Sequence, residues 1–315
     1  MRAFVFPGQG AQTVGMGKAL ADAYPSAAAV FAEVDDALGE PLSRLIWEGD
    51  ADTLQLTRNA QPALMATSMA ALRALESEGV PITAAAFVAG HSLGEYSALC
   101  AAGSFSLADT ARLLRLRGEA MQNAVPVGQG AMAALLGLDF EAVAAVAREA
   151  QSEGGTCQAA NDNDPSQVVV SGSREAVERA VAIAKSRGAK RALLLPVSAP
   201  FHSSLMQPAA EAMRDALAGV ALRTPAVPLV ANVTAGPVTD PEVIRSLLVK
   251  QVTGFVRWRE SVLWMARAGV RESWEIGAGK ALSNMIRRTA PGIAHARNVG
   301  TPEEARAVAG TLSAA

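Results

Sequence analysis

The stretch Gly90-His91-Ser92-Leu93-Gly94 decides the fold of this 315-residue chain, because it predicts a nucleophile elbow between a strand and a helix. The preceding segment 84–89 is a short apolar run typical of a buried parallel strand, and segment 95–102 is rich in helix formers and ends at Gly103. Glycines at 90 and 94 leave room for a serine in a strained turn. We therefore predict a reactive serine at position 92; the alternative is a glycine-rich turn with a capping serine.

The partner of this serine can be sought among only three histidines. His202 lies in the loop 197–204, just after the apolar run 192–195, where a loop residue beyond a strand end is well placed to act as a general base. The alternative is a solvated loop histidine. His91 adjoins the serine, so its side chain should leave the turn in another direction and serve packing or turn stability. His295, in an expected late strand over 292–297, is interpreted as structural.

Arg117 falls inside an apolar stripe of the helix predicted over 107–122. On a wheel of 100° per residue, the other members of that stripe are Leu113, Leu114, Ala120 and Met121. A guanidinium cannot shed its charge, so a buried one needs an anionic partner. Three partners stay open at this point: an internal carboxylate, solvent reached by snorkelling, or a carboxylate on a substrate.

The middle of the chain predicts a small inserted subdomain. After the Pro-Gly break at 126–130, the pattern gives strands over 131–138, 156–160, 167–171 and 189–195, with helices over 141–153 and 174–187. This βαββαβ order is the ferredoxin-like signature. We expect an α/β, three-layer parallel-sheet main domain (1–126 and 197–315) that carries a ferredoxin-like subdomain (127–196), with the active site in the cleft between them.

A series of short motifs follows in order along the chain. The motifs are Phe6-Pro7-Gly8-Gln9-Gly10-Ala11-Gln12, Gln61-Pro62-Ala63, the 90–96 elbow, Arg117-Gly118, Asn161 with Asn163, Ala199-Pro200-Phe201-His202, Ala231-Asn232-Val233, and Gln251 ahead of Val256-Arg257-Trp258. With these seven or more ordered motifs, the chain resembles the malonyl-CoA:acyl carrier protein transacylase family of fatty acid synthesis, and more broadly the acyltransferase domains of polyketide synthases. The resemblance runs nearly end to end, and an α/β-hydrolase-like main domain is the fold it implies.

The resemblance implies a ping-pong acyl transfer. Ser92 would take the malonyl group, and His202 would activate it and later deprotonate the incoming thiol. A backbone carbonyl at Gln251 would orient the histidine, in place of the aspartate of a hydrolase triad. This is chemically tolerable because a thioester is already an activated acyl donor.

The same resemblance assigns the rest of the site. The backbone N–H groups of Gln9 and Leu93 would form the oxyanion hole, and Arg117 would bind the free carboxylate of malonate. Phe201, just before the histidine, is similar to the malonyl-selective type, although one methyl group is worth only about 1–3 kcal/mol in such a pocket. The remaining residues expected at the substrate site are His91 and Asn161.

Composition agrees with an enzyme that has a large core. Half of the residues are hydrophobic, yet no apolar run reaches the ~18 residues of a membrane span, and the N-terminal strand is too short for a signal peptide. Two isolated cysteines, Cys100 and Cys157, argue against a disulfide framework or a metal cluster and favour a cytoplasmic location. A net charge of −2 argues against nucleic-acid binding. We expect a monomer with no bound cofactor.

Coenzyme A and an acyl carrier protein, whose phosphopantetheine carries the thiol, are the partners that the resemblance implies. An acidic carrier needs a basic dock. Two candidates are Arg287 with Arg288 near the C-terminal helix, and the small-domain group Lys185, Arg187, Lys190 and Arg191. Other function classes stay open: a trans-acting polyketide synthase acyltransferase, a serine thioesterase or hydrolase, and a non-catalytic carrier-binding module.

Overall fold

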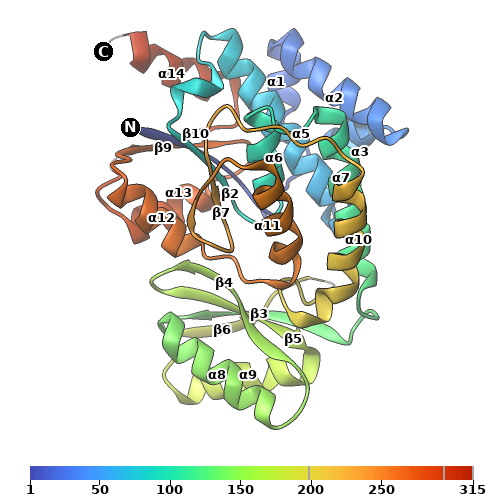
Figure 1. The fold of residues 1–315 in the computed structure, drawn as a ribbon, viewed down its shortest axis with the longest axis vertical. Helices are drawn as coiled ribbons and strands as arrows, with labels where there is room; N and C mark the ends of the chain where they lie inside the picture. Colours follow the sequence, from blue (N-terminus) through green and yellow to red (C-terminus); the bar gives the residue numbers. More distant parts are fainter. Residues whose placement is uncertain (198, 294, 314–315) are drawn as a thin grey trace.

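The computed structural model of the chain describes residues 1–197, 199–293 and 295–313. Its larger part is built on a six-stranded sheet with the order β10-β9-β1-β2-β7-β8 (Figure 1). All neighbours in this sheet are parallel except the edge pair β7 and β8. The strands are β1 Arg2–Phe6, β2 Phe87–Gly90, β7 Leu229–Ala231, β8 Gly236–Val238, β9 Glu272–Ile276 and β10 His295–Val299.

Both faces of this sheet are buried, as its apolar strands require. In β1, Phe4 and Phe6 join the large core, which also contains residues of the helices Pro25–Leu38 (α2), Thr57–Ser77 (α5) and Leu107–Asn123 (α7). Ala3 and Val5 join a second core with residues of the helices Trp258–Arg267 (α12) and Ala281–Thr289 (α13). The alternation of side chains along a strand thus separates two helical layers. The predicted three-layer α/β architecture is confirmed.

Helices of the larger part fall into two groups along the chain. Those before the small sheet are α1 Lys18–Ala23, α2 Pro25–Leu38, α3 Leu42–Glu48, α4 Ala51–Gln55, α5 Thr57–Ser77, α6 Gly94–Ala101 and α7 Leu107–Asn123. Those after it are α10 Gln207–Ala218, α11 Pro241–Thr253, α12 Trp258–Arg267, α13 Ala281–Thr289 and α14 Pro302–Ser313. Short 3₁₀ turns span Ile82–Ala84 and Ser204–Met206.

The segment between α7 and α10 forms a separate four-stranded sheet of order β4-β5-β3-β6, antiparallel throughout. Its elements are β3 Gly130–Leu136, α8 Phe140–Ser152, β4 Cys157–Asp164, β5 Gln167–Ser173, α9 Arg174–Ser186 and β6 Arg191–Leu194. Helices α8 and α9 cover the face that points away from the six-stranded sheet (Figure 1). This is the predicted ferredoxin-like arrangement.

Several predicted strand boundaries are wrong. The strand expected over 131–138 covers Gly130–Leu136, the one expected over 167–171 continues to Ser173, and the one expected over 292–297 covers His295–Val299. Three further differences have a visible cause. The strand expected over 84–89 begins only at Phe87, because Pro81 opens a 3₁₀ turn and pairing with β1 starts at Ala3 opposite Phe87. The strand expected from 189 begins at Arg191, since the Ala189 N–H still closes the end of α9 on Ala184 O. Strand β4, expected to stop at 160, continues through four polar residues to Asp164.

None of the helices in the described part of the chain is both long and apolar enough to cross a membrane.

Candidate active site

Ser92 lies at the turn between β2 and α6, as the elbow predicts, with φ +54°. His202 has φ +57°, and only one further non-glycine residue in the described ranges has a positive φ. The turn is possible only with glycines on both sides: a Cβ at Gly90 would lie 1.9 Å from Gly94 C, and one at Gly94 would lie 2.2 Å from Phe6 O. Strain at both positions is typical of functional sites.

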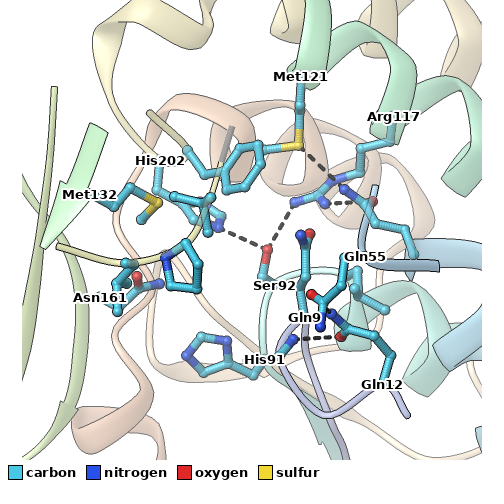
Figure 2. A pocket seen from close by; sticks show the side chains of 17 residues that line it. Gln9, Gln12, Gln55, His91, Ser92, Arg117, Met121, Met132, Asn161 and His202 are labelled. Atoms are coloured by element: carbon cyan, nitrogen blue, oxygen red, sulfur yellow. Dashed lines mark hydrogen bonds between the residues drawn. The ribbon is translucent and has the colours of Figure 1, made fainter. Parts of the chain in front are cut away.

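Ser92 and His202 contact each other directly. His202 Nε2 lies 2.8 Å from Ser92 Oγ (Figure 2). Its Nδ1 faces two backbone carbonyls, Gln251 O at 2.9 Å and Gly254 O at 3.1 Å. A carbonyl only accepts, so Nδ1 must carry the proton and Nε2 is left with the lone pair that can accept from the serine hydroxyl.

Burial keeps this imidazole neutral. Desolvation, and after it the nearby charge of Arg117, lowers the pKa of His202 to about 3. The two carbonyls oppose that shift by accepting from the ring. His202 is therefore an unprotonated base over the whole neutral range.

Arg117 is 1% exposed, which excludes snorkelling. Its Nη1 donates to Gln61 Oε1 at 2.8 Å, and its Nη2 donates to Gln251 Oε1 at 2.8 Å and to Ser92 Oγ at 3.1 Å. No carboxylate in the described residues lies within ion-pair distance of it. All of its described acceptors are neutral oxygens, so the internal ion pair considered above is absent from this part of the chain.

A cavity of about 250 Å³ opens in front of these side chains. Figure 2 shows Ser92, His202 and Arg117 converging on it, with Met132 and Asn161 of the four-stranded sheet on one side. The site therefore lies between the two sheets, as predicted. The predicted residues Gln9, His91, Leu93 and Phe201 also line the cavity, together with Gly10, Gln12, Gln55, Gln61, Met121 and segment 195–197.

Two backbone amides at this cavity are free to bind an oxyanion. Neither the Gln9 N–H nor the Leu93 N–H donates a hydrogen bond within the described ranges. The Gln9 loop is held from behind, because Gln12 accepts from Gly10 N at 2.7 Å and donates to Gln55 at 2.7 Å. Such preorganised donors are what a developing oxyanion requires.

The other predicted residues take supporting positions. Phe201 is 8% exposed and Asn161 is 6% exposed, both at the cavity wall. His91 points away from the serine, and its Nε2 lies 2.9 Å from Asn163 Oδ1 on β4, so this contact joins the elbow to the small sheet. The backbone of His295 is in β10, but its side chain lies outside the described residues, as does all of Ser198.

Within the part of the chain that is described, no cluster of histidine, cysteine and acidic residues could hold a metal ion, and both cysteines are free.

Some of the basic residues considered as a dock for the carrier protein already bond to other residues of the chain. Arg288 pairs with the buried Asp164 at 2.7 Å, and Arg287 donates to Asn284 at 3.1 Å. Arg187 pairs with Glu149 on the small domain. Lys190 and Arg191 are exposed at the start of β6, the strand that leads into the cavity-lining segment 195–197.

Residues 3–309 match the family model described as acyl transferase domain. The chain belongs to this acyl transferase family. The match spans nearly the whole chain, so both sheets of this acyltransferase are included.

Named relatives narrow the position of this acyltransferase within the family. It is 48% identical to the malonyl CoA-acyl carrier protein transacylase of Escherichia coli (strain K12), over 91% of this chain and 92% of that protein. The crystal structure of an acyl-carrier-protein S-malonyltransferase from Bartonella henselae has a TM-score of 0.96 and 58% identity, covering 99% of each chain. A malonyl-transacylase in complex with its type II polyketide synthase acyl-carrier protein has a TM-score of 0.95 and 40% identity, over 98% and 99%.

Sequence reasoning gave no role to three polar residues that the acyltransferase buries around this site. Gln61, Glu95 and Asn232 are 1%, 2% and 0% exposed. Each of them is part of a sequence motif, but the sequence alone assigned it no function. The usable signal was Glu95, an acidic residue directly after the elbow in a helix whose other positions are apolar or small.

Proposed function

We propose that this acyltransferase moves the malonyl group from malonyl-CoA to the phosphopantetheine thiol of an acyl carrier protein through a malonyl-Ser92 intermediate. The observation that carries the proposal is Arg117: a buried guanidinium, bonded only to neutral oxygens in the described residues, 3.1 Å from Ser92 Oγ. A buried cation in that position favours an acyl group that brings its own carboxylate.

The short distance between the Arg117 guanidinium and Ser92 Oγ limits the length of the acyl group. In a malonyl ester of Ser92, the free carboxylate is separated from the ester carbonyl carbon by a single methylene. The guanidinium that now contacts Oγ is therefore within reach of that carboxylate with little movement. A longer dicarboxylic acyl group would have to fold back in a cavity of only about 250 Å³, where Phe201 and Met132 already line the wall.

The first half-reaction uses the geometry as it stands. His202 Nε2 takes the proton from Ser92 Oγ, which attacks the thioester carbon of malonyl-CoA. The N–H groups of Gln9 and Leu93 stabilise the oxyanion. When the tetrahedral intermediate collapses, the carbon–sulfur bond breaks, and the imidazolium returns its proton to the coenzyme A thiolate. Gln251 O and Gly254 O hold the ring throughout.

The second half-reaction reverses these roles. His202 deprotonates the carrier thiol, the thiolate attacks the malonyl ester, and the proton passes to the departing Ser92 Oγ. The orienting groups at Nδ1 are neutral carbonyls, which support an imidazolium less than a carboxylate would. This arrangement favours an activated thiol as acceptor over water and speaks against the thioesterase alternative. The intact Ser92–His202 pair speaks against a non-catalytic module.

In the cell, this activity would supply chain-extender units for fatty acid synthesis. The similarity to a polyketide synthase malonyl-transacylase supports service to a polyketide carrier as a second candidate. We further propose domains at 1–126 with 197–315 and at 127–196, a monomer without bound cofactor, and a cytoplasmic location.

Intact-protein mass spectrometry after brief exposure to malonyl-CoA tests the proposal, with peptide mapping and acetyl-CoA as comparison. The expected result is a malonyl adduct on Ser92 that disappears when holo carrier protein is added. An adduct lost equally fast without carrier would support the hydrolase instead. Absence of any adduct would overturn the enzyme mechanism altogether.

A further inference from the structure

Glu95 places a buried carboxylate directly beneath the proposed nucleophile. Its Oε1 accepts from Asn232 N at 2.9 Å, and its Oε2 accepts a short hydrogen bond from Gln251 Nε2. No lysine or arginine pairs with it in the described residues. Burying an acidic side chain without a cation as partner costs free energy of folding. We therefore ask what this carboxyl group does at the site through its two hydrogen bonds.

The side chain of Gln251 connects Glu95 to the cation. Its Nε2 donates to Glu95 and to Ser92 O at 2.9 Å, while its Oε1 accepts from Arg117 Nη2 at 2.8 Å. The backbone oxygen of the same residue accepts from His202 Nδ1. One glutamine therefore contacts the nucleophile, the base and the cation.

The orientation of that amide is a choice between two states. A glutamine amide can rotate by 180°, which exchanges its oxygen and its nitrogen. In the rotated state, the NH₂ group would face the Arg117 guanidinium, which has only donors, and the oxygen would face Glu95, which in its ionised form has only acceptors. Glu95, together with the Ser92 carbonyl, therefore favours the state in which Gln251 offers an oxygen to Arg117.

We propose that Glu95 is a positioning residue of this site: through the Gln251 amide, its carboxylate fixes the Arg117 guanidinium in the orientation that receives a substrate carboxylate. This inference rests on the proposed malonyl transfer and adds a specificity element to it. Burial raises the pKa of Glu95 to about 7, so above this pH its carboxylate also places a negative charge near Arg117 while the site is empty.

The Glu95→Gln variant isolates this role. Its oxygen can still accept from Asn232 N, so the support of the elbow is kept, but its NH₂ group now faces the NH₂ of Gln251. We expect the rate of Ser92 acylation by malonyl-CoA to fall tenfold or more, mainly through a higher KM, whereas acylation by acetyl-CoA changes less than twofold. Free malonate should likewise compete about tenfold less well against acetyl-CoA.

Glu275→Gln is the matched control. Glu275, on β9, is also fully buried and accepts from the Leu282 and Ser283 N–H groups at the start of α13, but it does not line the cavity. It should leave the malonyl-to-acetyl ratio unchanged. Equal loss on both substrates in Glu95→Gln, or no loss at all, would overturn the inference. Failure of the unmodified enzyme to form malonyl-Ser92 would instead overturn the proposed function.

Discussion

At the scale of single residues, Arg117 is the side chain expected to distinguish malonyl from acetyl donors. Its burial lowers its pKa, yet a guanidinium stays charged at any pH at which the protein is folded. Arg117→Ala removes the only described cation in contact with Ser92 Oγ. We expect malonyl acylation to fall by 10²-fold or more and acetyl acylation by no more than severalfold, because only malonyl presents a carboxylate to pair.

Arg112→Ala is the appropriate control, since Arg112 lies on the exposed face of the same helix, where it pairs with Asp109. Mass-spectrometric acylation rates with both donors measure the effect. Equal losses on the two donors would assign Arg117 a structural role.

His202 predicts how stability depends on pH. Its folded-state pKa of about 3 lies below the ordinary 6.5, so the unfolded chain binds the proton more readily. The free energy of unfolding should therefore fall as the pH drops from about 6.5 toward 3. Burial also lowers the pKa of His91, which adds to the same trend.

His202→Gln removes one of these titrations. Thermal unfolding of both proteins between pH 7 and pH 4 should show a smaller loss of Tm in the variant. Parallel curves would mean that His202 titrates normally in the folded state.

The sequence predicted the residues with distinctive chemistry but not those that hold them. Ser92, His202 and Arg117 stand out because a glycine-flanked serine, a scarce histidine and a cation in an apolar stripe each violate a local expectation. The side chain of Gln251 shows nothing unusual in the sequence, and the one signal for Glu95 is that an acidic residue follows the elbow in an otherwise uncharged helix. Their roles depend on contacts between residues 156 positions apart, which periodicity cannot reveal.

At the level of elements, the elbow depends on close approach between α6 and β1. Gly94→Ala would place a methyl group 2.2 Å from Phe6 O, which is backbone in the centre of the sheet and cannot yield. We expect a loss of about 1–3 kcal/mol in unfolding free energy, together with loss of acylation, because the strand and the turn must separate. Urea unfolding of the variant and the parent protein measures this loss, provided that the two proteins show the same m-value.

Gly310→Ala in α14 provides the comparison. A Cβ there meets nothing within 4 Å, so alanine should stabilise the helix by up to about 1 kcal/mol. If Gly94→Ala were as stable as the parent protein, the packing argument for the elbow would be wrong.

Strand β4 shows why element boundaries escaped prediction. Residues 161–164 read Asn-Asp-Asn-Asp, a composition that normally ends a strand. In the folded protein, all four are buried, and their partners come from the larger part of the molecule: Val256 backbone, Arg259, His91 and Arg288. Tertiary pairing thus overrides local propensity, and these contacts hold the two sheets on either side of the cavity.

On the scale of the whole molecule, the contacts between residues 161–164 and the larger part also bear on which basic group could bind a carrier protein. Arg288 forms an ion pair with Asp164, whose carboxylate is fully buried. Replacing Arg288 would therefore leave the buried charge of Asp164 unpaired. A loss of carrier binding in an Arg288 variant would therefore not identify a dock. Strand β6 offers a cleaner surface: it is an edge strand, Leu193 and Leu194 are 46% and 45% exposed, and Lys190 and Arg191 precede them.

We therefore expect Arg191→Glu to raise the KM for holo carrier protein about tenfold at low salt, with a smaller effect at high salt. Formation of malonyl-Ser92 from malonyl-CoA should be unchanged, because Arg191 does not line the cavity. Arg148→Glu, an exposed charge reversal on α8 of the same sheet's far face, is the control. An equal effect of Arg148→Glu would reduce the result to net charge, whereas an effect of Arg287→Glu alone would move the dock to α13.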